Sequence, residues 1–239
     1  MSQIFNFKQF SVEQDKCAMK IGTDGVLLGG WASQKKEVFS VLDVGTGTGV
    51  ISLMLAQRFQ SAQIEAIEID DSTYEQAVSN FENAPWGDRL FCYHASFQEY
   101  FQEVDDEKYE LIISNPPFFK PSQKSDNIQR NLARFEDALP FEHLVYGASK
   151  LLSEDGIFAV VIPNEQEEHF IKLANAVHLH VQKVTRVRGC KNTAIIRSLI
   201  EFGFEEVTPR EDELVIEIER HQYTDAYKSL LDDFYLDLR

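Results

Sequence analysis

The sequence predicts an α/β fold built on a largely parallel sheet. Short apolar runs alternate with segments of helical spacing, the first run ends in a glycine-rich turn, and the last third of the chain alternates as paired antiparallel strands do. Strands that alternate with helices are typical of a parallel sheet. The expected strands are residues 38–44, 64–69, 90–94, 109–113, 156–163, 181–187, 193–204 and 214–218. The expected helices are residues 49–60, 70–83, 139–152 and 224–236.

The early strands are identified by the residues directly after them. Residues 38–44 (VFSVLDV) run into closely spaced glycines, which indicates a buried strand before a tight turn. Residues 64–69 (IEAIEI) precede Asp70 and Asp71, and acidic residues favour a helix start. No internal repeat or low-complexity linker interrupts the chain. We therefore expect an N-terminal extension over residues 1–36, a central domain over 37–206, and a C-terminal strand and helix over 207–239, packed on that domain.

Composition excludes several classes of protein. The 18 Phe and 8 Tyr among 239 residues exclude a disordered chain, which lacks the aromatic surface that offsets ordering entropy. Cys17, Cys92 and Cys190 lie outside Cys-x-x-Cys or Cys/His spacing, so we expect no disulfide framework and no metal site. The first residues lack the apolar run of a signal peptide, and no stretch approaches the ~18–20 apolar residues of a membrane span. These observations predict a soluble, cytoplasmic protein, which we expect to be a monomer without membrane contact.

The formal charge of −16 argues against a nonspecific nucleic-acid binder, but the charges are segregated. Residues 169–200 contain no Asp or Glu, and residues 114–135 contain one acid. The basic residues of these stretches that we expect to contact a polyanion are Lys120, Lys124, Arg130, Arg134, Lys183, Arg186, Arg188, Lys191 and Arg197. The alternative is that they line solvated edges of the sheet.

The first chemical motif is the turn from Asp43 to Gly49 (DVGTGTG). Its glycines allow a tight turn and close approach to a ligand. A dinucleotide site usually reads G-x-G-x-x-G, whereas this turn reads G-x-G-x-G after an Asp. That spacing is associated with S-adenosylmethionine (AdoMet) rather than nicotinamide. Asp43 adds a carboxylate that a cationic ligand could use and a diphosphate could not. The alternative is a βα turn that binds nothing.

The second motif is Glu68-Ile69-Asp70, about twenty residues beyond the glycines. A doubly wound sheet places a carboxylate there against ribose hydroxyls, and a carboxylate can accept two hydrogen bonds from a vicinal diol. We assign Glu68 to that role and Asp70 to the N-cap of the next helix. Alternatively, both acids only favour the helix start.

The third motif, Asn115-Pro116-Pro117-Phe118, is the most specific. Two prolines fix the backbone and remove two amide donors. The Asn side-chain carbonyl and the Pro116 carbonyl then remain as acceptors for an exocyclic NH₂ group, and the ring offers a surface on which a base can stack. Asn-Pro-Pro is also a strong turn signal.

Together the three motifs resemble those of class I AdoMet-dependent methyltransferases that modify amino or amide nitrogens. The segments Phe7-Lys8-Gln9-Phe10, 17–25 (CAMKIGTDG), 223–227 (YTDAY) and 234–236 (FYL) narrow the resemblance to the bacterial tRNA1(Val) adenine-37 N6-methyltransferase family, from about residue 5 to the C-terminus. The resemblance implies a Rossmann-like fold with a seven-stranded, mostly parallel sheet whose last strand is antiparallel. It also implies AdoMet as cofactor and tRNA as substrate.

The resemblance assigns roles residue by residue. Asp43, Gly45, Gly47 and Gly49 would line the methionine end of AdoMet, Glu68 would bind the ribose, and Ile69 would pack on the adenine. The stretch that would close over the cofactor contains Met19, Lys20, Gly22, Thr23 and Asp24. The catalytic set is Asn115, Pro116, Pro117 and Phe118, with Asn115 also touching AdoMet.

The chain departs from the family pattern at two places. Ala95-Ser96 stands where relatives carry Asp, so Ser96 would accept a hydrogen bond from the cofactor's adenine amine without charge. Phe118 replaces the commoner Tyr and keeps only the ring. Other functions stay open: methylation of an rRNA guanine, a DNA adenine or a protein glutamine, or a catalytically decayed RNA-binding module.

Overall fold

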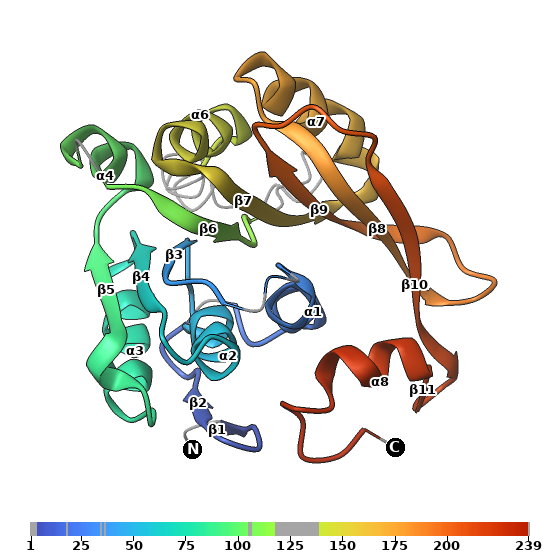
Figure 1. The fold of residues 1–239 in the computed structure, drawn as a ribbon. Coiled ribbons are helices and arrows are strands. Elements are labelled where there is room, and N and C mark those ends of the chain that lie inside the picture. Colours follow the sequence, from blue (N-terminus) through green and yellow to red (C-terminus); the bar gives the residue numbers. More distant parts are fainter. Residues whose placement is uncertain are drawn as a thin grey trace, which may run out of the picture.

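A computed structural model of the chain, shown in Figure 1, describes residues 4–17, 19–33, 35, 37–104, 107–117 and 139–238. The strands are β1 (Ile4–Asn6), β2 (Ser11–Glu13), β3 (Ser40–Val44), β4 (Gln63–Glu68), β5 (Leu90–His94), β6 (Tyr109–Ser114), β7 (Leu152–Pro163), β8 (His180–Cys190), β9 (Ile195–Gly203), β10 (Arg210–Glu219) and β11 (Gln222–Tyr223). The α-helices are α1 (Thr23–Trp31), α2 (Val50–Arg58), α3 (Asp71–Glu82), α4 (Phe97–Glu103), α6 (Phe141–Leu151), α7 (Glu167–Ala176) and α8 (Asp225–Leu231). Two short 3₁₀ helices are η1 (Gly87–Arg89) and η2 (Asn164–Gln166).

The main sheet of the described residues has nine strands in the order β11-β10-β8-β9-β7-β6-β3-β4-β5. Strands β5, β4, β3, β6 and β7 are parallel, and β9 lies antiparallel between β7 and β8. These strands and β8 form the expected seven-stranded sheet, in which β9, the last in sequence, is the antiparallel strand. The predicted fold is therefore confirmed, but the count of seven is corrected, because β10 pairs parallel with β8 and β11 extends that edge.

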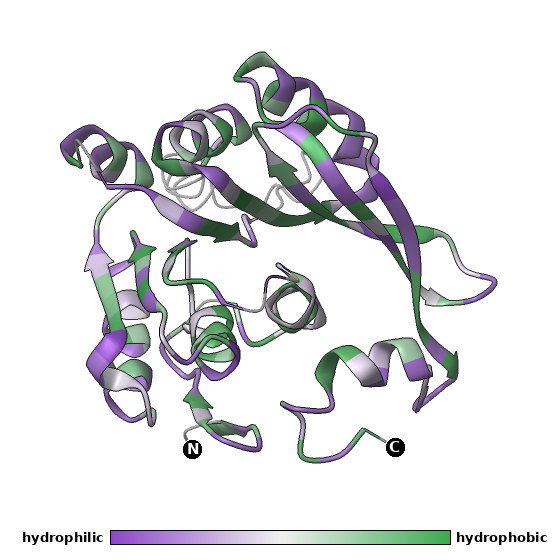
Figure 2. Ribbon diagram, in the orientation of Figure 1, coloured by the Kyte–Doolittle hydropathy of each residue, from purple (hydrophilic) through white to green (hydrophobic). Residues whose placement is uncertain are grey.

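Two hydrophobic clusters cover the two faces of the sheet. One joins α1, α2, α8 and the N-terminal strands to the sheet, and the other joins α4, α6 and α7 to it. Figure 1 shows these helices on opposite sides of the central strands. In Figure 2 the central strands are largely hydrophobic, whereas the edge strand β10 is largely hydrophilic. This difference is expected, because strands covered on both faces need apolar side chains on both faces.

The sheet reverses its strand order at β3. The next strand along the chain, β4, lies on one side of β3, and β6 lies on the other side. Ligands of doubly wound sheets bind outside the carboxyl ends of the strands at such a switch point. The glycine-rich turn after β3 and the Asn-Pro-Pro segment after β6 lie at these two carboxyl ends.

The two ends of the described chain meet on one face. Phe7 and Tyr235 form an isolated antiparallel bridge, and the Lys8 backbone N–H donates to the Phe234 carbonyl at 2.8 Å. The rings of Phe7 and Phe10 stack at a centroid distance of 4.5 Å, and Tyr235 lies 5.7 Å from Phe7. The N-terminal strands are thus fixed by residues more than two hundred positions away.

Three helices were not expected from the sequence. Helix α1 contains Gly25, Gly29 and Gly30, which lower helix propensity. A Cβ at Gly29 would lie 2.9 Å from the Met54 sulfur, and one at Gly30 would lie 2.7 Å from Leu231, so close packing of α1 on α2 and α8 explains these two glycines. Helix α4 has only seven residues, and the first turn of α7 follows η2 without an intervening loop.

Within the described ranges, no helix is long and apolar enough to cross a membrane. No group of three or more His, Cys, Asp or Glu side chains gathers there in a way that could hold a metal ion.

Candidate active site

The glycine-rich turn leaves open space at two of its three glycines. Gly45, Gly47 and Gly49 have φ angles of 72°, 59° and 81°, a left-handed region that favours glycine. A Cβ on Gly45 or Gly47 would meet no atom within 4 Å, whereas one on Gly49 would lie 2.5 Å from the Phe81 ring of α3. Gly45 and Gly47 can therefore approach a ligand. Gly49 allows the turn to pack against Phe81, and its expected contact with the cofactor stays a prediction.

Asp43 is a fully buried carboxylate at the end of β3. Its Oδ2 accepts hydrogen bonds from the hydroxyls of Thr46 and Ser52, both at 2.7 Å. Its Oδ1 is buried and has no hydrogen-bond partner among the described residues. Burial raises the pKa of the Asp43 carboxyl to about 6, although the two hydroxyls oppose that shift. A buried acceptor without a partner is costly unless a ligand supplies a donor, and a cationic donor fits best.

Glu68 joins the end of β4 to the glycine-rich turn. Its Oε2 accepts from the Gly47 N–H at 2.9 Å, and its Oε1 accepts from the N–H groups of Ile69 and Asp70 at 3.0 Å. Burial raises the pKa of this carboxyl. A carboxylate has about four acceptor positions, so Oε2 keeps capacity for a ligand hydroxyl. Asp70 accepts from the Thr73 N–H and is the N-cap of α3, which confirms its predicted role.

Asn115 is placed beside the same turn through its neighbour. The Ser114 hydroxyl donates to the Val44 carbonyl at 2.8 Å, and this bond ties the end of β6 to the residue that precedes Gly45. Ser114 is fully buried and Asn115 is partly exposed. A Cβ built on Gly25 of α1 would lie 3.6 Å from Asn115 Nδ2. The first turn of α1 therefore lies close to the Asn115 amide nitrogen, while Asp43 and Glu68 border the glycine-rich turn.

The other expected cofactor residues are more exposed. Met19 and Ile69 are 62% and 42% exposed, and Lys20, Gly22 and Thr23 are exposed or partly exposed as well. Exposure at this edge is compatible with the expected contacts to AdoMet, which stay predictions.

Asp24 Oδ2 accepts a hydrogen bond from Arg197 Nε at 2.7 Å. A carboxylate has about four acceptor positions, so the expected contact of Asp24 with the cofactor stays a prediction.

Ser96 has a structural partner that the sequence analysis did not assign. It is the N-cap of α4: its hydroxyl accepts from the Glu99 N–H at 3.2 Å, and its own backbone N–H donates to Glu99 Oε2 at 3.1 Å. This reciprocal arrangement is a capping box. Ala95 donates its N–H to the Glu68 carbonyl at 3.2 Å. The expected bond from the adenine amine to Ser96 would have to use the hydroxyl's remaining lone pair.

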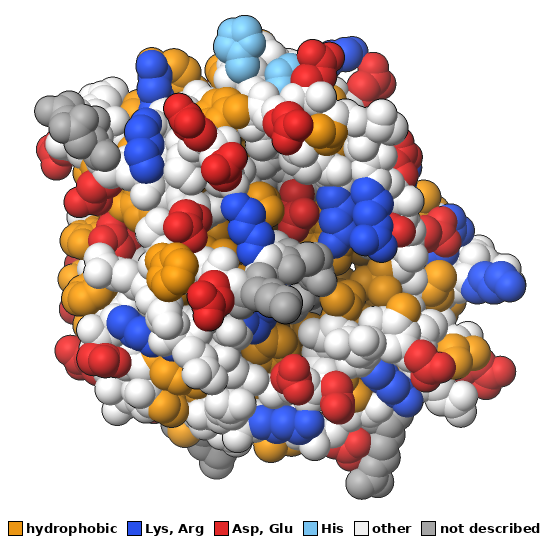
Figure 3. All heavy atoms as spheres, viewed as in Figure 1, with side chains coloured by type: hydrophobic (Ala, Val, Ile, Leu, Met, Phe, Trp, Pro, Cys, Tyr) orange, Lys and Arg blue, Asp and Glu red, His pale blue; other side chains and the backbone are white. Residues whose placement is uncertain are grey.

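Several of the expected RNA-binding side chains are paired within the protein. Arg186 donates to both oxygens of Glu167 and to Glu211 at 2.8 Å, and Arg188 donates to Glu213 at 2.6 Å. Lys183 lies over the Trp31 ring at 4.2 Å. Figure 3 shows the same mixing on one face of the molecule, where Lys and Arg side chains lie close to Asp and Glu.

The basic field of residues 169–200 is therefore weaker than their sequence indicates. The sequence could not show this, because the neutralising acids Glu211 and Glu213 come from β10, a separate strand. Lys191 is exposed on the turn between β8 and β9. The remaining expected residues, Phe118, Lys120, Lys124, Arg130 and Arg134, lie outside the described residues.

Four supporting residues were missed by the sequence analysis. Thr46 and Ser52 hold Asp43, and Ser114 joins the two strand ends. Asn80 of α3 donates to the carbonyls of Thr48 and Glu13 and thereby fixes β2 beside the turn. For Ser52 and Ser114 the available signal was a small polar residue in or beside an apolar run, since buried polar groups normally have partners. Thr46 and Asn80 stand in polar or glycine-rich segments and carried no such signal.

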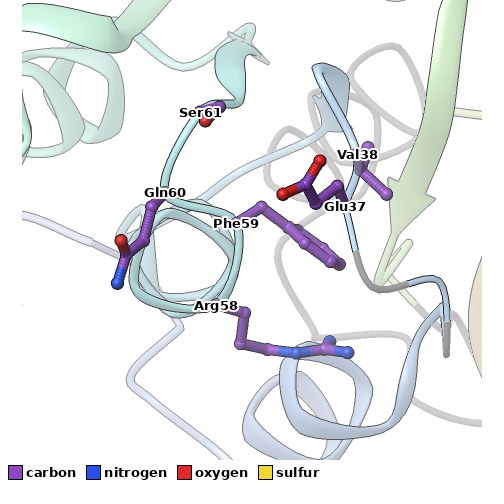
Figure 4. A pocket seen from close by; sticks show the side chains of 6 residues that line it. All are labelled: Glu37, Val38, Arg58, Phe59, Gln60 and Ser61. Atoms are coloured by element: carbon purple, nitrogen blue, oxygen red, sulfur yellow. The ribbon is translucent and has the colours of Figure 1, made fainter.

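A hollow of about 230 Å³ lies elsewhere, lined by Glu37, Val38, Arg58, Phe59, Gln60 and Ser61 (Figure 4). Val38 precedes β3 and Ser61 precedes β4, so this hollow lies at the amino ends of the strands. Arg58 is already used there, donating to the carbonyls of Gly29, Ala32 and Ser33 at the end of α1. The hollow is therefore separate from the candidate active site.

Comparison with known proteins identifies the family. The family model "Methyltransferase small domain" matches residues 26–192. The tRNA1(Val) (adenine(37)-N6)-methyltransferase of Christiangramia forsetii is 54% identical over 238 residues, covering 99% of each chain. Its namesake in Flavobacterium johnsoniae is 56% identical over 98% of this chain and 100% of that one. The chain belongs to the tRNA1(Val) (adenine(37)-N6)-methyltransferase family.

Solved structures agree with the methyltransferase fold. A predicted O-methyltransferase from Agrobacterium tumefaciens gives a TM-score of 0.68 at 18% identity, covering 88% of this chain and 96% of that one. TYW2 of Pyrococcus horikoshii, solved in complex with MeSAdo, gives 0.58 at 14% identity, covering 84% and 70%. At these low identities, the two structures support the fold of the chain and nothing about its substrate.

Proposed function

We propose that the protein transfers the methyl group of AdoMet to N6 of an adenine in tRNA, namely adenine 37 of tRNA1(Val). The observation that carries this proposal is the position of Asn115 at the carboxyl end of β6, tied through Ser114 to the glycine-rich turn. At this position Asn115 directly follows a strand end that is tied to the glycine-rich turn, and the residues of that turn fit a cationic cofactor. Family membership over nearly the full chain supports the same substrate.

The residues present fit AdoMet. Asp43 Oδ1, which has no hydrogen-bond partner in the part of the chain that the structure describes, can accept one from an ammonium group. The open space at Gly45 and Gly47 admits ligand atoms against the backbone. Glu68 can accept from a ribose hydroxyl with the remaining capacity of Oε2. When bound, AdoMet supplies an electrophilic methyl group on a sulfonium.

The chain's own residues orient the nucleophile. Adenine N6 is a poor nucleophile because its lone pair is delocalised into the ring. The Asn115 side-chain carbonyl and the Pro116 main-chain carbonyl would accept the two N–H bonds of N6 and favour a pyramidal nitrogen. Well-oriented reactants can gain roughly 7–11 kcal/mol, so orientation accounts for much of the required acceleration. No base needs to act before the attack, since the methylated nitrogen is acidic and loses its proton afterwards.

The decisive experiment combines an assay in vitro with one in cells. Purified protein and unmodified tRNA1(Val) transcript are incubated with methyl-labelled AdoMet, and the nucleosides are separated by mass spectrometry. We expect N6-methyladenosine at position 37 and none in a transcript with guanine there. The tRNA from a deletion strain should lack the same nucleoside. Methylation of a different base or macromolecule would contradict the proposal.

A further inference from the structure

One ion pair joins the first turn of α1 to the opposite side of the active site. Asp24 Oδ2 accepts from Arg197 Nε at 2.7 Å, although the two residues are 173 positions apart. The side chains are 27% and 30% exposed, so the pair lies at the rim and not in the core. Neither residue belongs to the glycine-rich turn or to the Asn-Pro-Pro motif.

Arg197 stands next to the strand ends that carry the acceptor motif. It lies on β9, where it is the register partner of Pro163, the last residue of β7. Strand β7 in turn pairs with β6, with Ser114 opposite Val160. The end of β6 therefore continues into Asn115 beside the end of β7, on the same edge as Arg197.

Asp24 stands next to the helix residue that covers Asn115. A Cβ on the adjacent Gly25 would lie 3.6 Å from Asn115 Nδ2 and 3.7 Å from Val50. The N-cap of α1 is Gly22, which has no side chain with which to cap the helix. The other end of α1 is fixed separately, because Arg58 donates to three carbonyls there. The Asp24–Arg197 pair thus acts on the part of α1 that contacts Asn115.

We propose that Asp24 and Arg197 form a positioning pair, which holds the first turn of α1 against Asn115 and so sets the orientation of the acceptor amide. The inference rests on the proposed function and adds a positioning role to residues outside its motifs. A partly exposed ion pair contributes little to stability, so the fold does not depend on it. Misplacement of a reacting group by about 1 Å can nevertheless cost up to about 10²-fold in rate.

The first test uses conservative variants. Asp24→Asn keeps the shape of the side chain and Arg197→Lys keeps the charge that RNA would encounter. We expect each to lower kcat on tRNA1(Val) about tenfold, with KM for tRNA within about twofold and Tm within about 4 °C. The control is Glu213→Gln, which breaks the Arg188–Glu213 pair on the same sheet at 2.6 Å and should leave kcat unchanged. An unchanged kcat in both Asp24→Asn and Arg197→Lys overturns the inference.

The second test asks whether the pair acts through Asn115. In an Asn115→Ala background, Asp24→Asn should cause no further loss of residual turnover. A full additional tenfold loss would show that Asp24 acts independently of Asn115, and the inference would be wrong.

A third measurement does not need activity. In ¹⁵N-labelled protein without cofactor, the Asn115 side-chain NH₂ resonances, assigned through Asn115→Ala, should shift in Asp24→Asn and Arg197→Lys but not in Glu213→Gln. Unshifted resonances contradict the positioning role. If the resonances shift as expected but the wild-type protein methylates no tRNA, the proposed function fails while the coupling between the pair and Asn115 stands.

Discussion

Replacement of Asp43 by Asn should change how stability depends on pH. The folded carboxyl has a pKa of about 6 against an ordinary value of 3.8. The folded state therefore holds this proton more tightly than the unfolded state, so the free energy of unfolding falls as pH rises from about 4 to about 6 and is constant above. The difference in pKa corresponds to about 3 kcal/mol, at about 1.36 kcal/mol per unit. About 1.4 kcal/mol of this falls between about pH 5 and 7.5.

The amide of the Asp43→Asn variant does not titrate. The difference in unfolding free energy between wild type and variant should therefore change by about 1.4 kcal/mol over that interval, in favour of the variant at high pH. Urea unfolding followed by the fluorescence of Trp31 and Trp86 measures this difference. Any constant cost of the amide cancels in the comparison. A difference that stays constant from about pH 5 to 7.5 would refute the reasoning about the buried charge.

Calorimetry of AdoMet binding extends the same test. Loss of a charged hydrogen-bond acceptor costs about 1.5–3 kcal/mol, so Asp43→Asn should weaken binding by about 10–150-fold at neutral pH. Binding to wild type should release a proton below about pH 6, because a cationic ligand favours the ionised carboxylate. Equal affinity of variant and wild type would mean that Oδ1 does not contact the cofactor.

Three further outcomes are expected. Asn115→Ala should lower kcat by roughly 10²–10³ with AdoMet affinity nearly unchanged, measured by turnover and calorimetry, and near-normal turnover would remove Asn115 from the mechanism. Gly49→Ala should lower Tm, since its Cβ would lie 2.5 Å from Phe81. Gly47→Ala should weaken AdoMet binding with less effect on Tm, because a Cβ there meets no atom within 4 Å. The reverse pattern would contradict a packing role for Gly49 and a ligand role for Gly47. Lys191→Gln should reduce the slope of log K for tRNA binding against log salt concentration by about 0.7–0.9. Arg186→Gln should reduce that slope less, because Arg186 is paired with Glu167 and Glu211. Equal slopes for the two variants would argue against this difference.

Local chemistry made the centre of the fold predictable. The apolar runs at β3, β4 and β6 are bounded by glycines, acids and prolines, which mark where each strand must end. Asp70 was recognisable as an N-cap because its role depends on residues three positions away. The candidate motifs were found for the same reason, since each lies within a short continuous segment.

Long-range pairing was not predictable in this way. Arg186 and Arg188 stand among basic residues in the sequence. Their partners Glu211 and Glu213 lie on β10, which pairs in parallel with β8 and is not one of the seven expected strands of the sheet. The Asp24–Arg197 pair joins segments 173 residues apart. Helix α1 was missed because its glycines serve packing against Met54 and Leu231, a requirement that only the assembled fold imposes.

The bridge between Phe7 and Tyr235 sets an order of events during synthesis. At about 5–20 residues per second, a ribosome reaches Tyr235 roughly 10–50 s after Phe7. During this time the rings of Phe5 and Phe7 lack their contacts with the Tyr235 ring. The segment that leads from these rings into α1 therefore lacks one of its contacts until translation is nearly finished, whereas Asn80 and Arg58 can already hold β2 and the end of α1. A nascent chain that already contains every catalytic motif would still lack the contact between its first strand and Tyr235.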